Sequence, residues 1–215
     1  MTDADVRSDD ARRVRKPRTD GERSRNAILN EAARLATVEG IGGLSIARLA
    51  DAVGMSKSGL FAHFGSKEEL QLATIETATA VFSEEVIEPA LAAPTGLERL
   101  RQLAEHFIAH VESGIYPGGC FFASVAAEVD THPGPVRDRA IATAGEWLGQ
   151  LEAAVRDAQA EGALDPSADA EQLAFEVDAY LLLGNLQYVV SQDATPMSRA
   201  RRAIDARLAT VAPAQ

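Results

Sequence analysis

The chain has 215 residues, 46% of them hydrophobic, and a net charge of −11. This length is sufficient for a hydrophobic core in one or two domains, and the single cysteine excludes an intrachain disulfide. No apolar run is long enough to cross a membrane, and the charged N-terminus is unlike a signal peptide, so the sequence predicts a cytoplasmic protein without a membrane segment. Taken over the whole chain, the negative charge argues against binding to nucleic acid.

The charge is unevenly distributed along the chain. Residues 11–67 contain 11 Lys and Arg against 5 Asp and Glu, a net charge of +6, whereas residues 68–215 contain 9 against 23, a net charge of −14. A basic module on an acidic body is expected if only one end of the protein meets phosphate. The basic run over residues 12–18, taken alone, is more simply a solvated tail, although it is also able to follow a minor groove of DNA.

Apolar residues recur at helical spacing along most of the chain and no strand-like alternation is present, so the sequence predicts an all-α fold. Residues 1–18 lack an apolar period and are expected to be a disordered arm. Three helices are then expected in a small domain over residues 19–66, and six in a larger domain over residues 67–215. The nine expected helices cover residues 19–38, 44–53, 56–64, 66–89, 96–112, 120–129, 135–160, 165–191 and 195–211.

The most specific pattern lies over residues 44–70. Gly54 ends one short helix where a left-handed backbone is needed, and Ser56 is placed to cap the next helix. Ser66 and Glu69 predict a capping box at the start of the helix that follows. Two helices joined by a short glycine turn form a helix-turn-helix, whose second helix fits the major groove of DNA.

Residues 19–73 resemble the DNA-binding domain of the TetR family of bacterial transcriptional regulators, without gaps. Two positions depart from the family pattern: Phe61 stands where a phosphate-contacting tyrosine is usual, and Ala36 stands where an aromatic residue is usual. The matching blocks are Ile28-Leu29, Ala32-Ala33, Glu39-Gly40, Leu44 to Ala50, Gly54 to Lys57, Leu60 to Phe64 and Ser66 to Leu70.

The helix-turn-helix supplies the candidate DNA contacts. Lys57, at the start of the second helix, is suited to a guanine edge or a phosphate. The resemblance implies that His63 and Lys67 contact phosphate, and Ser45 and Arg48 are placed to do the same. For any one lysine or arginine, a solvated surface position is the simpler alternative. The full set of candidates is Ser45, Arg48, Ser56, Lys57, Ser58, Gly59, Phe61, His63 and Lys67.

The resemblance also implies a homodimer formed by the last two long helices, at about residues 169–190 and 197–211. Residues 174–190 are apolar on more than one face, as expected for a helix that packs on its own body and on a second copy. The alternative is a central helix in a monomeric core. Family members hold a small-molecule effector in this larger domain, which shifts the dimer between DNA-binding states.

Aromatic residues of the larger domain, with one cysteine, are the candidate ligand contacts, and an ordinary core position is the alternative for each. They indicate an apolar or aromatic effector. Cys120 falls at a helix N-terminus, where a thiolate is stabilised, so a cysteine switch is an alternative to a ligand, and a packed, inert thiol is the simpler view. The candidates are Phe82, Phe107, Tyr116, Cys120, Phe121, Trp147, Phe175 and Tyr180.

No catalytic or cofactor motif is present: the sequence lacks GxSxG, HExxH, GxGxxG and a Walker loop. His106 and His110 have the spacing of a metal pair but no nearby cluster of further ligands, so neither a metal nor a cofactor is expected. The sequence therefore predicts a DNA-binding regulator rather than an enzyme. Its partners would be a double-stranded palindromic operator, a second copy of the chain and an effector that releases a repressor. The alternative is a ligand-independent or cysteine-switched regulator.

Overall fold

The computed structural model describes residues 20–129, 131 and 133–213, and all regular structure in this part of the chain is helical. The expected all-α fold is therefore confirmed, while the expected arm over residues 1–18 lies outside the described residues. The helices are α1 (Asp20–Glu39), α2 (Ile46–Val53), α3 (Lys57–Phe64), α4 (Lys67–Phe82), the π-helical turn η1 (Ser83–Ile87), α5 (Glu88–Leu91), α6 (Gly96–Glu112), α7 (Phe121–Val129), α8 (Pro135–Ala160), α9 (Ala170–Ser191) and α10 (Thr195–Thr210).

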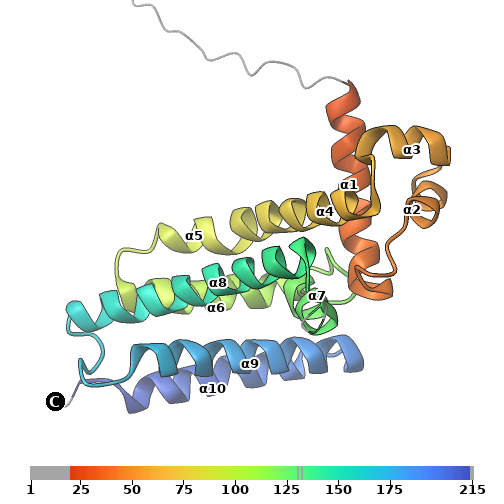
Figure 1. Ribbon diagram of the computed structural model, residues 1–215. Helices are drawn as coiled ribbons and strands as arrows, with labels where there is room; N and C mark the ends of the chain where they lie inside the picture. The colour runs from red at the N-terminus through yellow and green to blue at the C-terminus, as the bar shows by residue number, and fades with distance from the viewer. Residues whose placement is uncertain (1–19, 130, 132, 214–215) are drawn as a thin grey trace, which may run out of the picture.

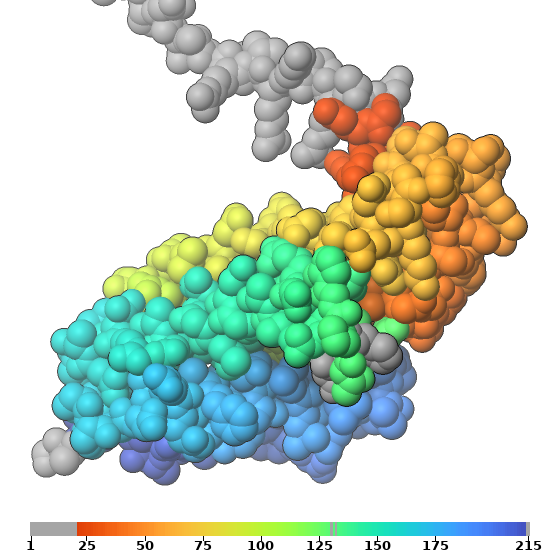
Figure 2. Space-filling view, in the orientation of Figure 1, coloured from red at the N-terminus to blue at the C-terminus, as the bar shows by residue number. Residues whose placement is uncertain are grey.

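The helices form a small lobe and an elongated body (Figure 1). Helices α1, α2 and α3 make the lobe at one end, and α4 runs from the lobe along the body. Helices α6 and α8 pack together in the middle of the body, and α9 and α10 pair along the side away from α4 and α5. The space-filling view shows the lobe projecting from the end of the body, which leaves it accessible to a large partner (Figure 2).

Short-range hydrogen bonds set the helix ends of the lobe as the sequence predicts. The hydroxyl oxygen of Ser45 accepts from the Arg48 N–H at 3.2 Å, and that of Ser56 accepts from the Gly59 N–H at 3.1 Å. Gly54 ends α2 with φ +67°, a left-handed conformation that glycine adopts without strain. These three local features fix the angle between α2 and α3 and confirm the predicted helix-turn-helix.

The predicted capping box is present in its first half: the Ser66 hydroxyl oxygen accepts from the Glu69 N–H at 3.1 Å and starts α4. Beneath these caps, α2 and α3 contribute Leu49, Leu60 and Phe64 to a core that also contains Ile28 and Leu29 of α1. Burying these side chains is the main favourable term in holding α2 and α3 on α1, because helices of eight residues are marginal alone.

The rod that begins with α4 was expected to end near Pro89, but it continues without a break through η1 and α5 to Leu91. Proline lacks an N–H, and in a regular helix its ring would clash with the carbonyl four residues earlier. The backbone widens just before this point, where the Glu88 N–H donates to the carbonyl of Ser83, five residues back. This π turn accommodates the proline and lengthens the rod.

Helix α9 was expected to start at Asp165-Pro166, and this expectation is wrong by about one turn. The Asp165 carboxylate accepts from the N–H of Ser167 at 2.8 Å and from its hydroxyl at 2.7 Å, which favours a turn over a helix. The helix begins at Ala170 instead, capped by Asp169, whose carboxylate accepts from the Gln172 N–H at 3.0 Å. The other helices follow the expected order, so the described residues form the nine rods predicted from the sequence.

The body is held by one large apolar cluster to which α4, α6, α8, α9 and α10 all contribute. The start of α6 lies directly against the end of α8. A Cβ atom added at Gly96 would lie 2.3 Å from the backbone nitrogen of Ala158, so only glycine allows this approach. Within the described part of the chain, none of the helices combines the length and apolar composition that crossing a membrane requires.

Candidate DNA interface and internal cavity

Helix α3 presents one side to the lobe and the other to solvent. Leu60 and Phe64 are buried against α1 and α2, whereas Lys57, Ser58 and Phe61 are exposed, Phe61 by 54%. Phe61 therefore lies on the open side of α3, where the sequence predicts contacts with DNA. The half-buried Gly59 keeps the outer face of α3 narrow, which permits close approach to a DNA groove.

The two serine candidates Ser45 and Ser56 lie at the starts of α2 and α3. Each oxygen accepts a capping hydrogen bond, and each hydroxyl hydrogen can still be donated to a phosphate. His63 is half-buried at the last turn of α3, with its ring centroid 6.1 Å from that of Phe64. Capping and a phosphate contact are therefore compatible for the serines.

The structure places Arg48 and Lys67 in contacts within the lobe. The Arg48 guanidinium donates to the Glu39 carboxylate at 2.6, 2.9 and 3.0 Å, which ties α2 to the end of α1. The Lys67 ammonium donates to the carbonyl of Gly42 at 2.5 Å. Either group would have to exchange or share these partners to reach a phosphate.

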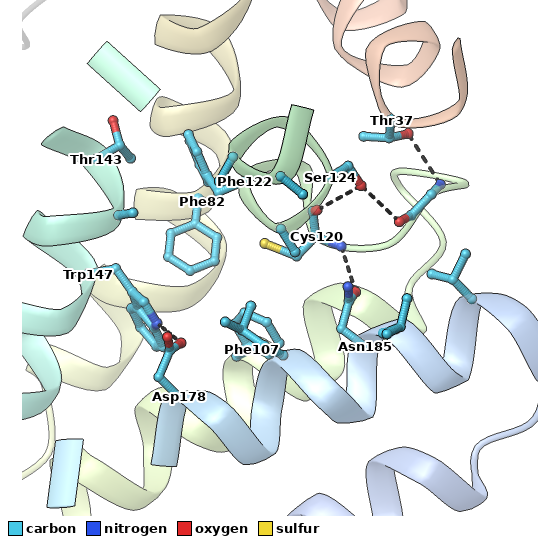
Figure 3. Close-up of a pocket in the computed structure, with 18 of the residues that line it drawn as sticks. Thr37, Phe82, Phe107, Cys120, Phe122, Ser124, Thr143, Trp147, Asp178 and Asn185 are labelled. Carbon is cyan, nitrogen blue, oxygen red and sulfur yellow. Dashed lines mark hydrogen bonds between the residues drawn. The ribbon is translucent and has the colours of Figure 1, made fainter. Parts of the chain in front are cut away.

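The body contains a cavity of about 660 Å³, partly open to solvent, between α4, α6, α7, α8 and α9 (Figure 3). This volume lies in the usual range for a small-molecule site. The walls are mainly apolar. The polar side chains along them belong to Thr37, Ser124, Thr143, Asp178 and Asn185, and the thiol of Cys120 joins them.

Four of the eight residues predicted to contact a ligand line this cavity: Phe82, Phe107, Cys120 and Trp147. The other four lie elsewhere. Tyr116 and Phe121 belong to the neighbouring apolar cluster under α1, and Tyr180 packs on the main core. Phe175 lies on α9 and is 62% exposed. The ligand contacts themselves stay a prediction.

Aromatic rings form one end of the cavity (Figure 3). The ring centroids of Phe82 and Trp147 are 5.2 Å apart and nearly perpendicular, and those of Phe107 and Trp147 are 5.8 Å apart and stacked. Phe122 meets Phe82 edge-on at 5.9 Å. Such contacts fix the orientation of each ring, so this part of the wall is preformed.

Asp178 was missed by the sequence reasoning. It projects from α9 beside Trp147, whose indole N–H donates to its carboxylate at 2.8 Å (Figure 3). Burial raises the pKa of Asp178, and the hydrogen bond from Trp147 opposes this shift. The signal was available in the sequence, because Asp178 lies in the largely apolar segment 174–190, and a carboxylate that is even half-buried in such a segment usually has a partner.

Asn185 was also missed, and it holds the segment that leads into α7. Its side-chain oxygen accepts from the Cys120 N–H at 2.8 Å, which joins the start of α7 to α9 (Figure 3). Burial raises the pKa of the Cys120 thiol to about 11, against the opposite influence of the Phe122 and Ala123 amides at the helix start. The thiol is therefore protonated near neutral pH, and the expected stabilisation of a thiolate at this N-terminus is outweighed.

His110 and His106 do not form a metal site with their surroundings. His110 is buried, and its Nδ1 atom lies 2.6 Å from the carboxylate of Glu85, while its ring meets Phe82 edge-on. Among the described residues, no group of three or more His, Cys, Asp or Glu side chains is arranged to hold a metal ion. The imidazole of His110 is thus paired with the carboxylate of Glu85.

The cavity wall and the lobe are in direct contact at the end of α1. The N–H of Gly118, which lines the cavity, donates to the hydroxyl oxygen of Thr37 at 3.2 Å (Figure 3). A Cβ atom added at Gly118 would lie 2.0 Å from the carbonyl oxygen of Thr37, so the two backbones touch. Arg34 adds a hydrogen bond at 2.7 Å to the carbonyl of Ile115.

A second connection joins α7 to the loop between α1 and α2. The carboxylate of Glu128 accepts from the backbone N–H groups of Ile41 and Gly42, both at 2.6 Å. From the other side, Gln71 of α4 donates to the carbonyl of Ile41 at 2.7 Å. Because Ala126 and Ala127 on α7 line the cavity, one short helix touches both the cavity and the lobe.

Two protein-family models match the sequence. The model described as bacterial regulatory proteins of the tetR family matches residues 28–74, and the model described as the C-terminal domain of tetracyclin repressor-like proteins matches residues 96–204. Together they cover most of the lobe and most of the body. No match was found among curated protein sequences.

Solved structures are similar over nearly the whole chain. A TetR transcriptional regulator from Chloroflexus aurantiacus is 26% identical, with a TM-score of 0.82 that covers 89% of this chain and 97% of the other. A TetR-family regulator from Cytophaga hutchinsonii is 18% identical, with a TM-score of 0.80 over 93% of this chain and 100% of the other. AibR, solved with isovaleryl coenzyme A and operator DNA, is 26% identical, with a TM-score of 0.67 over 89% and 99%.

Proposed function

Because the chain belongs to the TetR family of bacterial transcriptional regulators and is a DNA-binding regulator, we propose that it is a homodimeric repressor released from its operator by a small molecule. The observation that carries this proposal is the shared wall between cavity and lobe. Thr37 and Gly118 line the cavity and join α1 to the body, and α7 lines the cavity and holds the α1–α2 loop through Glu128. A molecule in the cavity therefore contacts the supports of the DNA-binding lobe.

The proposed dimer surface is an apolar stripe along α9. Its members lie on the face of the helix away from its buried residues, and all are exposed although they are large and apolar. Two of them, Leu182 and Leu186, also line the open side of the cavity. Such a stripe is unfavourable in water and is best explained by a second copy packed across a two-fold axis. The stripe consists of Phe175, Leu182, Leu183, Leu186 and Val190, with Val190 79% exposed.

We propose that each protomer places α3 in a major groove, with Lys57 and Ser58 facing base edges and Phe61 against the sugar–phosphate backbone or a thymine methyl group. Ser45, Ser56 and His63 would hold phosphates and fix the position of the helix. A dimer of this kind reads two half-sites about one helical turn, roughly 34–36 Å, apart. The lobe tips therefore have to keep a fixed spacing.

Release follows if a ligand moves α7 or the end of α1. A shift of either helix would strain the hydrogen bonds of Glu128 to the α1–α2 loop and of Gly118 to Thr37, and the lobe would reorient. A ligand changes the population of the two states only by its difference in affinity for them. AibR was solved in complex with both isovaleryl coenzyme A and operator DNA. This supports the proposal that a protein of this fold binds a small molecule as well as DNA.

Two further parts of the proposal concern location and the alternative switch. The protein would act in the cytoplasm, where its operator is. A ligand in the cavity is favoured over a cysteine switch, because burial raises the pKa of Cys120 to about 11 and leaves little thiolate to react near neutral pH. A ligand-independent regulator would not need an internal cavity of about 660 Å³.

The decisive experiment is selection of bound sites from random duplex DNA, followed by a reporter fused to the recovered site. A palindrome with half-sites one turn apart is expected, together with reporter expression that rises when the gene for this protein is removed. Sequence-blind, salt-sensitive binding alone would contradict a specific operator. Expression that falls on removal would identify an activator and overturn the repressor role.

A further inference from the structure

The ligand cavity contains one carboxylate, Asp178, and no Lys, Arg or His side chain among the described residues that line it. We infer that its ligand is an organic cation, held with its charged group between Asp178 and the rings of Trp147, Phe82 and Phe107. The inference rests on the proposed function, since it names the class of ligand for the same cavity. It also revises the apolar or aromatic effector expected from the sequence, by adding a positive charge to it.

Asp178 lacks a counter-charge in the described part of the chain. It is half-buried, and a carboxylate removed even in part from water is destabilised unless an opposite charge or several hydrogen bonds compensate for it. Elsewhere on α9, Glu176 has such a partner in Arg207. Asp178 accepts one hydrogen bond, from the neutral indole of Trp147, and no basic group among the described residues shifts its pKa downward. A cation bound in the cavity would supply the positive charge that the described residues around Asp178 do not provide.

Aromatic rings gather beside that carboxylate. Trp147 donates its N–H to Asp178 and lies within 5.8 Å, between ring centroids, of both Phe82 and Phe107 (Figure 3). The face of an aromatic ring attracts a cation, most strongly for tryptophan, and alkylated ammonium groups are the usual ligands of such cages. A carboxylate beside Trp147, with Phe82 and Phe107 packed on that ring, therefore suits a tertiary or quaternary ammonium better than a neutral molecule.

The remaining polar groups of the cavity do not change its charge. Thr37, Ser124, Thr143 and Asn185 are neutral, and Cys120 is protonated because burial raises its pKa. The rest of the cavity is apolar, so the ligand would carry hydrocarbon or aromatic groups along with its charge. Residues 68–215 have a net charge of −14, which favours the approach of a cation over that of an anion such as a carboxylate or phosphate ester.

A structural explanation competes with this one: Asp178 could serve only to orient Trp147. Asparagine in its place would keep a similar shape and an oxygen that accepts from the indole, and would remove only the charge. The substitution Asp178→Asn therefore separates the two explanations. Trp147 is the only tryptophan of the chain, so its fluorescence reports directly on the cavity without the need for DNA.

The experiment titrates the full-length wild-type and Asp178→Asn proteins with pairs of probes that differ only in charge. Each pair contains a quaternary ammonium ion and the neutral hydrocarbon in which carbon replaces nitrogen, such as benzyltrimethylammonium and neopentylbenzene, followed by bulkier alkyl and aryl pairs. Trp147 fluorescence gives the affinities. For at least one pair, the wild type should bind the cation at least tenfold more tightly than its neutral partner. Asp178→Asn should remove that preference while changing neutral binding by less than about threefold.

Several results would overturn the inference: no cation of the series binding better than its neutral partner, or Asp178→Asn binding the cation as tightly as the wild type. Retained affinity for the neutral probe, with an unchanged thermal unfolding curve, shows that the variant is folded. Operator binding measured with the same probes tests the proposed function separately. Cations that bind at Trp147 without releasing DNA would refute release by this cavity and leave the ligand class standing. Release of DNA by neutral probes alone would refute the cationic ligand class and leave release by this cavity standing.

Discussion

In the lobe, Ser45, Ser56 and Ser66 each cap a helix through a hydrogen bond to a residue three positions along the chain. In the body, the cavity depends on contacts such as that between Cys120 and Asn185, 65 positions apart. The same chain thus uses local hydrogen bonds where a stereotyped DNA-reading shape is needed, and long-range packing where it encloses a space. The first kind of information can be seen in a short stretch of sequence, and the second cannot.

The two regions also differ in charge, and the difference matches what each is proposed to bind. Residues 11–67 are net positive and residues 68–215 are net negative, so a polyanion is attracted to one end and repelled by the other. Among the described residues, the hydrogen bonds between the two parts include those to Thr37, Ile41 and Gly42, which come from segments that also border the cavity. The following changes test how far lobe and body are separate and where they are coupled.

The largest effect is expected from Leu183→Glu in the exposed stripe of α9. Leu183 is 55% exposed, so the protomer should keep its helical content and unfolding midpoint, while a charge buried across the two-fold axis should prevent dimerisation. Operator affinity should then fall about 100-fold or more, because the second half-site no longer adds its avidity. Light scattering gives the mass, and fluorescence anisotropy with labelled operator gives the affinity.

Gln187→Glu is the matched control for this substitution, because Gln187 is exposed on the same helix but lies outside the stripe. It should remain dimeric and bind the operator normally. If Leu183→Glu also stayed dimeric with full affinity, the stripe would not be the dimer surface, and the lobe would be independent of this part of the body.

Glu128→Gln should weaken the connection between α7 and the lobe. A carboxylate accepts both the Ile41 and the Gly42 N–H, whereas a glutamine side chain has one oxygen and no charge. One of the two N–H groups therefore loses its acceptor, and the other keeps only a neutral one. Hydrogen bonds to a charged group contribute about 1.5–3 kcal/mol, so the two amides should exchange with solvent roughly 10- to 100-fold faster. Hydrogen exchange followed by NMR measures both amides directly.

Glu84→Gln, at an exposed position of η1, provides the control and should leave the two amides protected. In operator assays, the ligand that releases the wild type should act more weakly on Glu128→Gln than on Glu84→Gln. Unchanged protection of both amides in Glu128→Gln would mean that the loop is held by α1 and α4 alone.

The pH dependence of stability should show that the body, unlike the lobe, contains a deeply buried thiol. The pKa of Cys120 rises from 9.0 to about 11 on folding, so the folded state favours the protonated form. Its contribution is complete below pH 9 and is lost as the pH rises toward 11, where the unfolded state gives up its proton first. The free energy of unfolding should therefore fall by about 2 kcal/mol more in the wild type than in Cys120→Ala over this interval.

Chemical denaturation at a series of pH values measures this difference, and helical content at each pH checks that both proteins start folded. Burial also raises the pKa of Tyr116 to about 12, but Tyr116 is present in both proteins and cancels in the comparison. Parallel curves for the wild type and Cys120→Ala would show that the thiol is hydrated, and would reopen the cysteine switch.

The smallest effects are expected for single contacts of the lobe with DNA. Lys57→Ala should reduce the preference for the operator over random DNA by about tenfold, as expected when a base contact is lost. Lys67→Ala should weaken binding to both about equally and lower the salt slope by about 1. Equal losses on operator and random DNA for Lys57→Ala would mean that Lys57 contacts phosphate only.

The sequence predicted that aromatic residues of the body line a cavity, but not in every case which ones. Phe121 was predicted to contact a ligand, whereas the structure places Phe121 in the core under α1 and its neighbour Phe122 on the cavity wall. Successive helical residues point about 100° apart, so an error of one position exchanges the two roles. Only the rotation of α7 against α4 and α8 decides between them.

The sequence by itself determined the all-α class, the helix-turn-helix and its capping residues, and the family, because these depend on spacing within a few turns of one helix. Only the tertiary structure decided that Asp178 meets Trp147 in a cavity, that Glu128 holds the Ile41 and Gly42 amides, and that Arg48 pairs with Glu39. These pairs join different helices whose register and rotation follow from the packing of the whole core. That packing is a property of all side chains together, so no short segment of the chain specifies it.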